Sequence, residues 1–190
     1  VRDGFKDASI RPNQVFAVSL PFSPVPGNRQ REILSTVRRE LVTPFGLRSL
    51  APEHPRFTED FEGGEEIRAG ARHRGMVWPW LTCHFAESYI RTAGDTDAAY
   101  AFIRKTFRPL LERFPDDYCL NGMPEMYTPV PPFRPAGCVH SARSTAEIMR
   151  LQRFLHAILS GIPLLIEVIT PISVLLATVL AFISLARSSE

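Results

Sequence analysis

The chain has 190 residues, with 22 Lys and Arg against 20 Asp and Glu, and its net charge of +2 argues against a nucleic-acid or polyanion surface. Hydrophobic residues make up 45% of the sequence, which is typical of a globular domain rather than a disordered chain. Cys83, Cys119 and Cys138 are widely spaced and form no C-x-x-C pair, so the sequence predicts neither a disulfide framework nor a metal site. We therefore expect a reducing, cytoplasmic compartment.

The sequence starts at Val1, and no basic-then-apolar signal peptide follows. A chain of this length forms one domain or a part of one. We expect that the amino-terminal part of a longer domain precedes it.

The first apolar segment, residues 15–20, follows Pro12 closely, which favours a short helix entered at its first turn. Asn28 is predicted to cap a second helix that runs to about Thr43. Its apolar positions recur every three or four residues, as expected for one buried helix face: Ile33, Leu34, Val37 and Leu41. Residues 45–76 show no sustained periodicity, which predicts a long functional or mobile loop.

Residues 72–89 (RHRGMVWPWLTCHFAESY) lead from a polar loop into an apolar helix. Pro79 suits the first helical turn, and the apolar residues behind it predict a helix that is buried nearly all round. Trp78 and Trp80 flank that proline, next to His73, and two flat indoles with N–H donors suit the wall of a sugar pocket. The alternative is that both tryptophans belong to the core.

Residues 98–114 predict an amphipathic helix, although Pro109 disfavours its last turn. Residues 115–137 are rich in proline and loop-like, and within them Glu125 stands alone between apolar neighbours. Such a carboxylate is costly to desolvate unless it has a partner or a chemical role, and the alternative is an exposed loop glutamate. Ser141 or Ser144 is predicted to cap a last amphipathic helix.

The helices alternate with long polar loops, and there is no β-α-β alternation, Gly-rich phosphate loop or nucleophile elbow. This pattern predicts an all-α fold with a loop-built site at one end, and it predicts no cofactor.

Four ordered segments over about residues 8–150 together resemble the carboxy-terminal amylo-alpha-1,6-glucosidase domain of glycogen debranching enzymes. They are residues 11–21 (RPNQVFAVSLP), residues 43–50 (TPFGLRSL), residues 75–80 (GMVWPW), and Glu125 ahead of residues 134–138 (RPAGC). The resemblance implies a six-hairpin glycosidase fold, an (α/α)6 toroid, of which residues 1–153 would form roughly the second half. It also implies inverting hydrolysis of the α-1,6-linked glucose left at branch points of glycogen or limit dextrin.

By the same resemblance, Glu125 aligns with the general base. The glucose subsite would be lined by Asn13, Gln14, His73, Trp78 and Trp80. For His73 the alternative is a loop histidine bonded to backbone. An inverting mechanism needs a second carboxyl group ~6.5–9.5 Å away as general acid. In the family that acid lies upstream of Val1, so we expect this chain to be inactive without the missing amino-terminal half of the domain.

The sequence departs from the family pattern at several positions near the site. An Asp and a Tyr are usual where this chain has Ala69 and Arg72, and Arg74 replaces a Gln. Arg143 stands where a Trp is expected, and Thr128-Pro129 replaces Asp-Gly. These changes affect the predicted sugar contacts, so a non-catalytic glycan-binding remnant is the alternative function.

Residues 154–190 form an apolar tail that the resemblance does not cover. Residues 172–186 are an unbroken apolar helix candidate, shorter than the ~20 residues that a bilayer needs, although residues 155–186 with a Pro kink would reach. Three interpretations remain: a membrane anchor, an oligomer or core helix, and sequence foreign to the domain. The last two are favoured because a storage-polymer enzyme has no evident need for an anchor.

Overall fold

The computed structural model describes residues 7–113 and 122–159, and the side chains of these residues up to 156. The chain divides into two compact units, Val1–Gln152 and Arg153–Glu190, and the architecture below is that of the first. Its helical elements are η1 (Pro12–Val15), α1 (Phe16–Ser19), α2 (Gly27–Glu40), α3 (Glu65–Ala71), η2 (Pro79–Leu81), α4 (Thr82–Thr92), α5 (Asp97–Arg113) and α6 (Ala142–Leu159, which continues into the second unit). The strands are β1 (Val42–Thr43), β2 (Gly46–Arg48), β3 (Val77–Trp78), β4 (Met126–Tyr127) and β5 (Pro135–Ala136).

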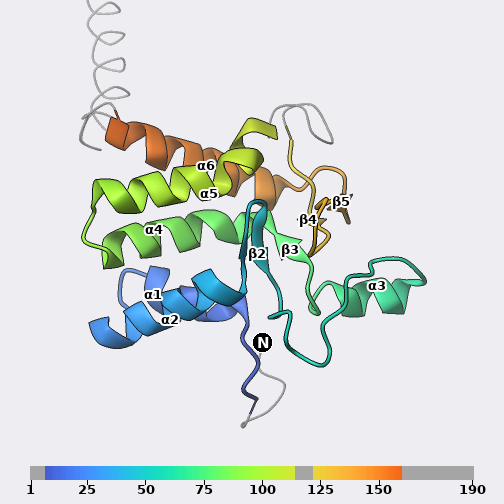
Figure 1. Ribbon diagram of the computed structural model, residues 1–190. Helices are drawn as coiled ribbons and strands as arrows, with labels where there is room; N and C mark the ends of the chain where they lie inside the picture. Colours follow the sequence, from blue (N-terminus) through green and yellow to red (C-terminus); the bar gives the residue numbers. More distant parts are fainter. Residues whose placement is uncertain (1–6, 114–121, 160–190) are drawn as a thin grey trace, which may run out of the picture. The chain divides into compact units, whose positions relative to one another are not determined.

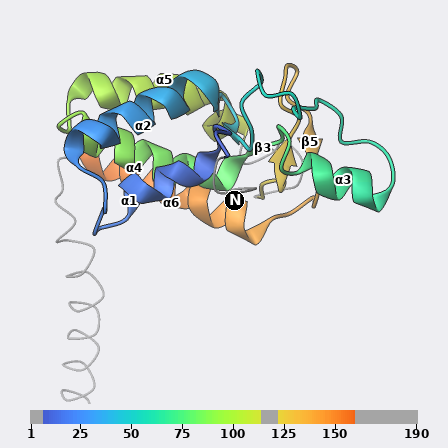
Figure 2. The same cartoon turned by 90° about the horizontal axis from the view of Figure 1, so that it is seen from below.

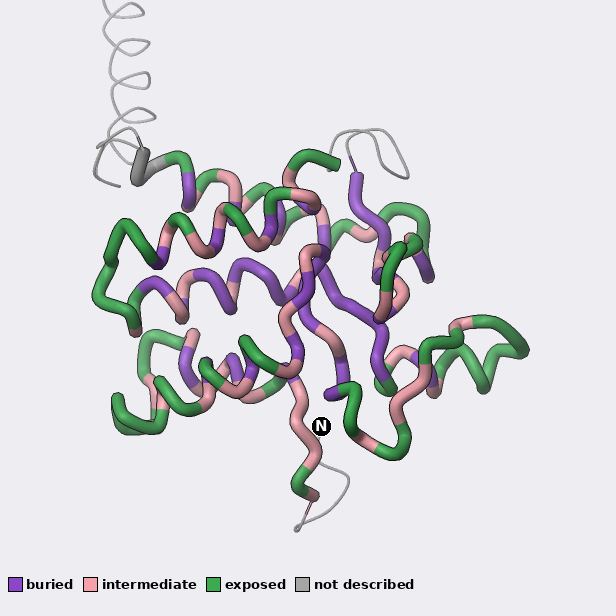
Figure 3. Tube along the Cα trace, viewed as in Figure 1, coloured by how far each residue is buried: buried purple, intermediate pink, exposed green. Residues whose placement is uncertain are grey.

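Helix α4 is the central helix of this unit. It contacts α1 and α2 as well as α5, and in Figure 1 it lies between them. The view from below shows α4 again in the middle of the helices (Figure 2). No side chain from Thr82 to Ile90 is exposed, so the prediction of a helix buried nearly all round is confirmed. Figure 3 shows the contrast with α3, which is exposed along most of its length.

The prediction of an all-α fold is wrong in one respect, because the chain also forms a small antiparallel sheet. Its strands follow the chain order β1-β2-β3-β4-β5, and Leu47 pairs with Trp78 while Val77 pairs with Tyr127. Each strand has only two or three residues, which is too short for the alternation that identifies a strand in a sequence. The sheet joins three segments that are far apart in the chain.

The first elements follow the sequence prediction in outline and differ at their ends. A short helix does begin at Pro12, as η1 followed by α1. Helix α2 begins at Gly27 with Pro26 as its N-cap and has no side-chain cap, so the prediction that Asn28 caps it is wrong. It also ends at Glu40 instead of Thr43, because residues 42–43 pair with β2.

The segment 45–76 is more ordered than its sequence predicts, since it contains β2 and α3. Helix α5 continues through Pro109 to Arg113, where the described part ends. Ser141 caps α6, because its Oγ accepts a hydrogen bond from the Ser144 N–H at 3.3 Å. Of the two serines predicted as the cap, the first is therefore correct.

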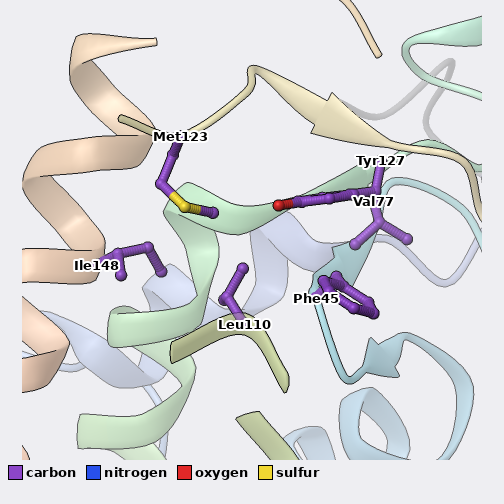
Figure 4. Packing of buried hydrophobic residues seen from close by; sticks show 6 residues of the cluster. All are labelled: Phe45, Val77, Leu110, Met123, Tyr127 and Ile148. Carbon is purple, nitrogen blue, oxygen red and sulfur yellow. The ribbon is translucent and has the colours of Figure 1, made fainter. Parts of the chain in front are cut away.

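A hydrophobic cluster joins the sheet to helices α5 and α6. Phe45 and Tyr127 pack with ring centroids 4.9 Å apart, and Val77 lies beside them. Figure 4 shows how Leu110, Met123 and Ile148 complete the cluster, and every member is at most 4% exposed. Burial of this kind stabilises by roughly 1.5–3 kcal/mol for each large side chain, so the strands are held by packing as well as by their few hydrogen bonds.

The toroid and the role of the apolar tail remain predictions. Residues 160–190, which include the tail's helix candidate, lie outside the described residues. A search of the part that the structure describes finds no helix with the length and apolar character of a membrane span.

Gly46 in β2 lies close against the backbone of Trp78 and Pro79, where the chain enters η2. Its φ is +135°, and a Cβ there would lie 2.5 Å from the Trp78 carbonyl oxygen. We predict that Gly46→Ala lowers the free energy of unfolding by about 2 kcal/mol or more, since it combines backbone strain with a clash against main chain.

Urea denaturation followed by circular dichroism measures this change. Gly27→Ala is the matched control, because a Cβ there meets nothing within 4 Å, and the change in stability should stay within about 1 kcal/mol. If Gly46→Ala and Gly27→Ala changed the free energy of unfolding equally, the close approach of β2 to the Trp78 backbone would not require glycine at position 46.

Candidate active site

A cavity of about 480 Å³ lies between η1 and the loop that precedes β3. Four parts of the chain supply its wall: residues 11–16, which include η1 and the start of α1, the residue after β2, the stretch from His73 through β3 to η2, and the first turn of α6. Its lining residues are Arg11, Pro12, Asn13, Phe16, Ser49, His73, Trp78, Trp80, Leu81 and Arg143. The volume is in the range of small-molecule sites.

The two tryptophans form the indole wall of this cavity, and they differ in how they are held. Trp78 is 8% exposed, and its Nε1–H donates to the Arg72 carbonyl at 3.1 Å. Trp80 is half-buried and stacks on Phe16, with ring centroids 5.8 Å apart. The Trp80 Nε1–H is itself buried and meets no acceptor within the described residues, which is costly unless water or a ligand accepts its hydrogen bond.

The start of η1 is tied to the opposite side of the cavity by Arg11. Its Nη1 donates to the His73 carbonyl at 2.7 Å and to the Ser49 carbonyl at 3.3 Å. The Gln14 amide donates to the Arg11 carbonyl at 3.0 Å, and its side chain faces a neighbouring hollow of about 440 Å³ that Asn13 also lines. Asn13 therefore borders both spaces, whereas Gln14 lies outside the lining of the indole cavity.

The loop that carries His73 is fixed by backbone contacts. The Gly75 N–H donates to Ser49 Oγ at 2.9 Å, and the Thr58 N–H donates to the Arg74 carbonyl at 2.8 Å. Gly75 has a φ of +145° and leaves no room for a Cβ beside the Thr58 carbonyl. The exposed His73 side chain is thus presented at the cavity from an anchored backbone.

Glu125 lies just before β4, where it is clamped against the turn after β5. Its backbone N–H donates to the Cys138 carbonyl at 2.9 Å, and its Oε2 accepts the Cys138 N–H at 3.0 Å. Arg72 Nη2 also reaches Oε2, at 3.2 Å. Gly137 has a φ of +76°, and a Cβ there would collide with Oε2, so only glycine lets the backbone come this close.

These contacts set the charge of Glu125. Burial raises the pKa of its carboxyl, but the Cys138 N–H and the Arg72 guanidinium, helped by the charge of Arg143, outweigh burial and hold the pKa below its ordinary value. The group is therefore a carboxylate at neutral pH. Oε2 takes both hydrogen bonds, and Oε1 accepts none from the described residues.

Arg72 connects Glu125 to the indole wall, because its carbonyl accepts from Trp78 while its guanidinium pairs with Glu125. Arg143 lies over the same wall, with its guanidinium carbon 4.4 Å from the centre of the Trp80 ring and 5.4 Å from that of Trp78. Glu125 itself is not among the residues that line the cavity. The carboxylate is thus linked to the cavity through two arginines.

Four of the six predicted site residues meet around one cavity: Asn13, His73, Trp78 and Trp80. Gln14 borders the neighbouring hollow, and Glu125 is joined to the group by Arg72. The sequence did not predict Arg11, Ser49 and Phe16 as lining residues, although Arg11 belongs to the same four-residue stretch as Asn13. Within the described residues, no cluster of three or more His, Cys, Asp or Glu side chains is placed to hold a metal.

The part of the chain that forms this site also matches a known protein family. The family described as Amylo-alpha-1,6-glucosidase matches residues 2–150, a range that contains the cavity, Arg72, Glu125 and Arg143. A search of curated proteins gave no significant match.

The ion pair with Arg72 gives a testable pH dependence. Because the folded-state pKa of Glu125 is depressed, the ionised group stabilises the fold above its unfolded pKa, and this contribution is lost as the pH falls through the folded value. We predict that Arg72→Met raises the pKa of Glu125 and moves this loss of stability to higher pH.

The measurement is a titration of the Glu125 side-chain carbon by NMR, together with unfolding at several pH values. Arg74→Met is the matched control, because Arg74 lies in the same loop and makes no described contact with Glu125. An unchanged Glu125 titration in Arg72→Met would show that the ion pair does not set the pKa.

Proposed function

We propose that this chain, which belongs to the amylo-alpha-1,6-glucosidase family, is part of a glycoside hydrolase domain that releases α-1,6-linked glucose at glycogen branch points with inversion. The observation that supports this most is an ionised carboxylate, Glu125, tied through Arg72 to a cavity with an indole wall. Glycogen or limit dextrin would be the partner.

Glu125 would act as the general base. A base needs an ionised oxygen that is free to take a proton from the attacking water. Oε2 is occupied by the Cys138 N–H and Arg72, while Oε1 accepts no hydrogen bond from the described residues. The clamp would therefore orient the carboxylate and leave one oxygen for the water.

The cavity would hold the glucose unit. Indole faces suit the C–H faces of a sugar, and polar groups at the rim suit its hydroxyls. Trp78 and Trp80 supply the indoles, and Asn13 and His73 lie at the same wall. Gln14, in the neighbouring hollow, would extend the subsite.

The general acid would come from elsewhere in the domain. Inverting hydrolysis needs a second carboxyl group, and among the described residues no Asp or Glu lines the cavity. We therefore propose that the chain does not run the full reaction by itself.

A second candidate function is glycan binding without hydrolysis. The observation that favours it is the Arg72–Glu125 ion pair, which occupies part of the carboxylate. The two functions share the cavity and differ in whether Glu125 takes a proton.

We predict that Glu125→Gln lowers kcat ~10²–10⁴-fold, because the amide keeps the shape of the carboxylate but cannot accept a proton. KM should change far less, since the base acts mainly in the transition state. The assay joins the chain to the amino-terminal part of a debranching-enzyme glucosidase domain and measures glucose released from limit dextrin.

Glu112→Gln is the control, because Glu112 is an exposed glutamate that pairs with Arg108 on α5. Circular dichroism checks that each variant folds. Nearly full activity of the folded Glu125→Gln variant would show that Glu125 is not the base and would favour the binding function.

We also predict that Trp80→Ala weakens binding of limit dextrin as well as turnover, because it removes part of the indole wall. Isothermal titration with the chain itself measures the affinity. Tyr100→Ala on α5 is the control, since Tyr100 is an aromatic residue outside the cavity. Unchanged affinity in Trp80→Ala would remove the indole wall from the glucose subsite.

A further inference from the structure

Arg143 forms part of the surface that a ligand in the cavity would meet. It is one of the lining residues, and its guanidinium carbon lies 4.4 Å from the centre of the Trp80 ring and 5.4 Å from that of Trp78. The guanidinium therefore lies over the indole wall. A sugar that fills the cavity against this wall meets the Arg143 side chain as well as the two indoles.

The side-chain contacts of Arg143 leave its N–H donors unused. It makes no hydrogen bond or ion pair with any residue that the structure describes, and it contacts only the rings of Trp80 and Trp78. Glu147, one turn further along α6, pairs with Arg150 at 2.8 Å instead. A guanidinium that stacks on an aromatic ring keeps its donors along its edge. The edge of Arg143 thus presents several donors at the wall of the cavity.

The charge of Arg143 already acts on Glu125, so its donors, and not its charge, are what a ligand can still use. Together with Arg72 and the Cys138 N–H, it holds the pKa of the Glu125 carboxyl below its ordinary value. Attraction between opposite charges is mutual, so the carboxylate also stabilises the guanidinium. The donors therefore need an acceptor but no further negative charge, and a sugar hydroxyl is a neutral acceptor.

The backbone that carries Arg143 is tied to the segment that carries Glu125. The Ser141 N–H donates to the Met123 carbonyl at 2.8 Å, and the Met123 N–H donates to Thr145 Oγ1 at 3.1 Å. The first turn of α6 and the residues just before β4 are therefore joined from both sides. A sugar bound by Arg143 would be placed by the same segment that places the proposed base.

We infer that Arg143 is a specificity-determining residue of this site. Its guanidinium, stacked on Trp80, donates hydrogen bonds from its edge to hydroxyls of a neutral glucose unit at the indole wall. Such contacts select a sugar by the positions of its hydroxyls, because a hydrogen-bonding group left without its partner is costly. The inference rests on the proposed function in one respect, namely that the ligand is a glucose unit.

Fluorescence titration of the full chain tests the inference, because both tryptophans of the chain line the cavity and report a sugar at the wall. The probes are glucose and 2-, 3-, 4- and 6-deoxyglucose, each of which lacks one hydroxyl. We expect loss of at least one hydroxyl to weaken binding about tenfold, the contribution of a hydrogen bond from a charged donor.

Arg143→Met keeps a long apolar side chain over the indoles but has no donors. We expect it to bind glucose about tenfold more weakly. The loss caused by removing the same hydroxyl should shrink to about twofold or less, because that hydroxyl no longer has its partner in the protein. Arg108→Met is the matched control, since Arg108 is an exposed arginine on α5 that pairs with Glu112, and it should leave every hydroxyl contribution unchanged. Circular dichroism confirms that both variants fold.

Two results would overturn the inference and leave the proposed function standing. One is that glucose binds but each hydroxyl contributes equally in the original chain and in Arg143→Met, or contributes nothing in either. The other is tighter binding of glucose to Arg143→Met than to the original chain, which would show that Arg143 covers the indole wall and competes with the sugar. Failure of all five sugars to bind the original chain would remove the glucose subsite itself, and with it both proposals.

Discussion

The burial of α4 is the constraint on which the rest of the structure depends. A helix with no exposed side chain from Thr82 to Ile90 can be accommodated only when other elements cover it on several sides. Helices α1, α2 and α5 do so, and η2 contacts α4 and leads directly into it. Because Gly46 has no side chain, β2 can close onto the Trp78 backbone at that entrance. The indole wall therefore adjoins the buried core, and the preceding loop also holds it, because the Arg72 carbonyl accepts a hydrogen bond from Trp78.

A charged contact secures α4 to α6 next to this core. Arg150 pairs with Glu147 at 2.8 Å on its own helix and with Glu87 on α4. Burial alone would lower the pKa of Arg150, but the two carboxylates outweigh it and raise that pKa. The nearby Cys83 thiol has a raised pKa, mainly because of burial, and is therefore a packing residue and not a nucleophile. This network ties α6 to α4.

The site is defined by arginines as much as by tryptophans. Arg72 and Arg143 are two positions at which the sequence departs from the pattern of its family, and both contact candidate site residues. Arg72 clamps the Glu125 carboxylate, and Arg143 covers the two indoles. The two guanidinium groups add positive charge next to the predicted sugar contacts, and both lower the pKa of Glu125. The chemistry of this chain therefore depends on these two arginine contacts as well as on the predicted sugar contacts.

The sequence by itself determined the helices with long apolar faces, the buried character of α4, a serine cap at residue 141 or 144 and the set of segments that belong together. These features depend on local periodicity and on short motifs, which can be read without coordinates. Only the tertiary structure decided the five short strands, the true ends of α2, and the partners of Glu125. Strands of two or three residues carry no period, and the ion pair joins residues 53 positions apart. Nothing local in the sequence specifies such contacts, because they form only when the packing of α4 and the sheet brings distant loops together.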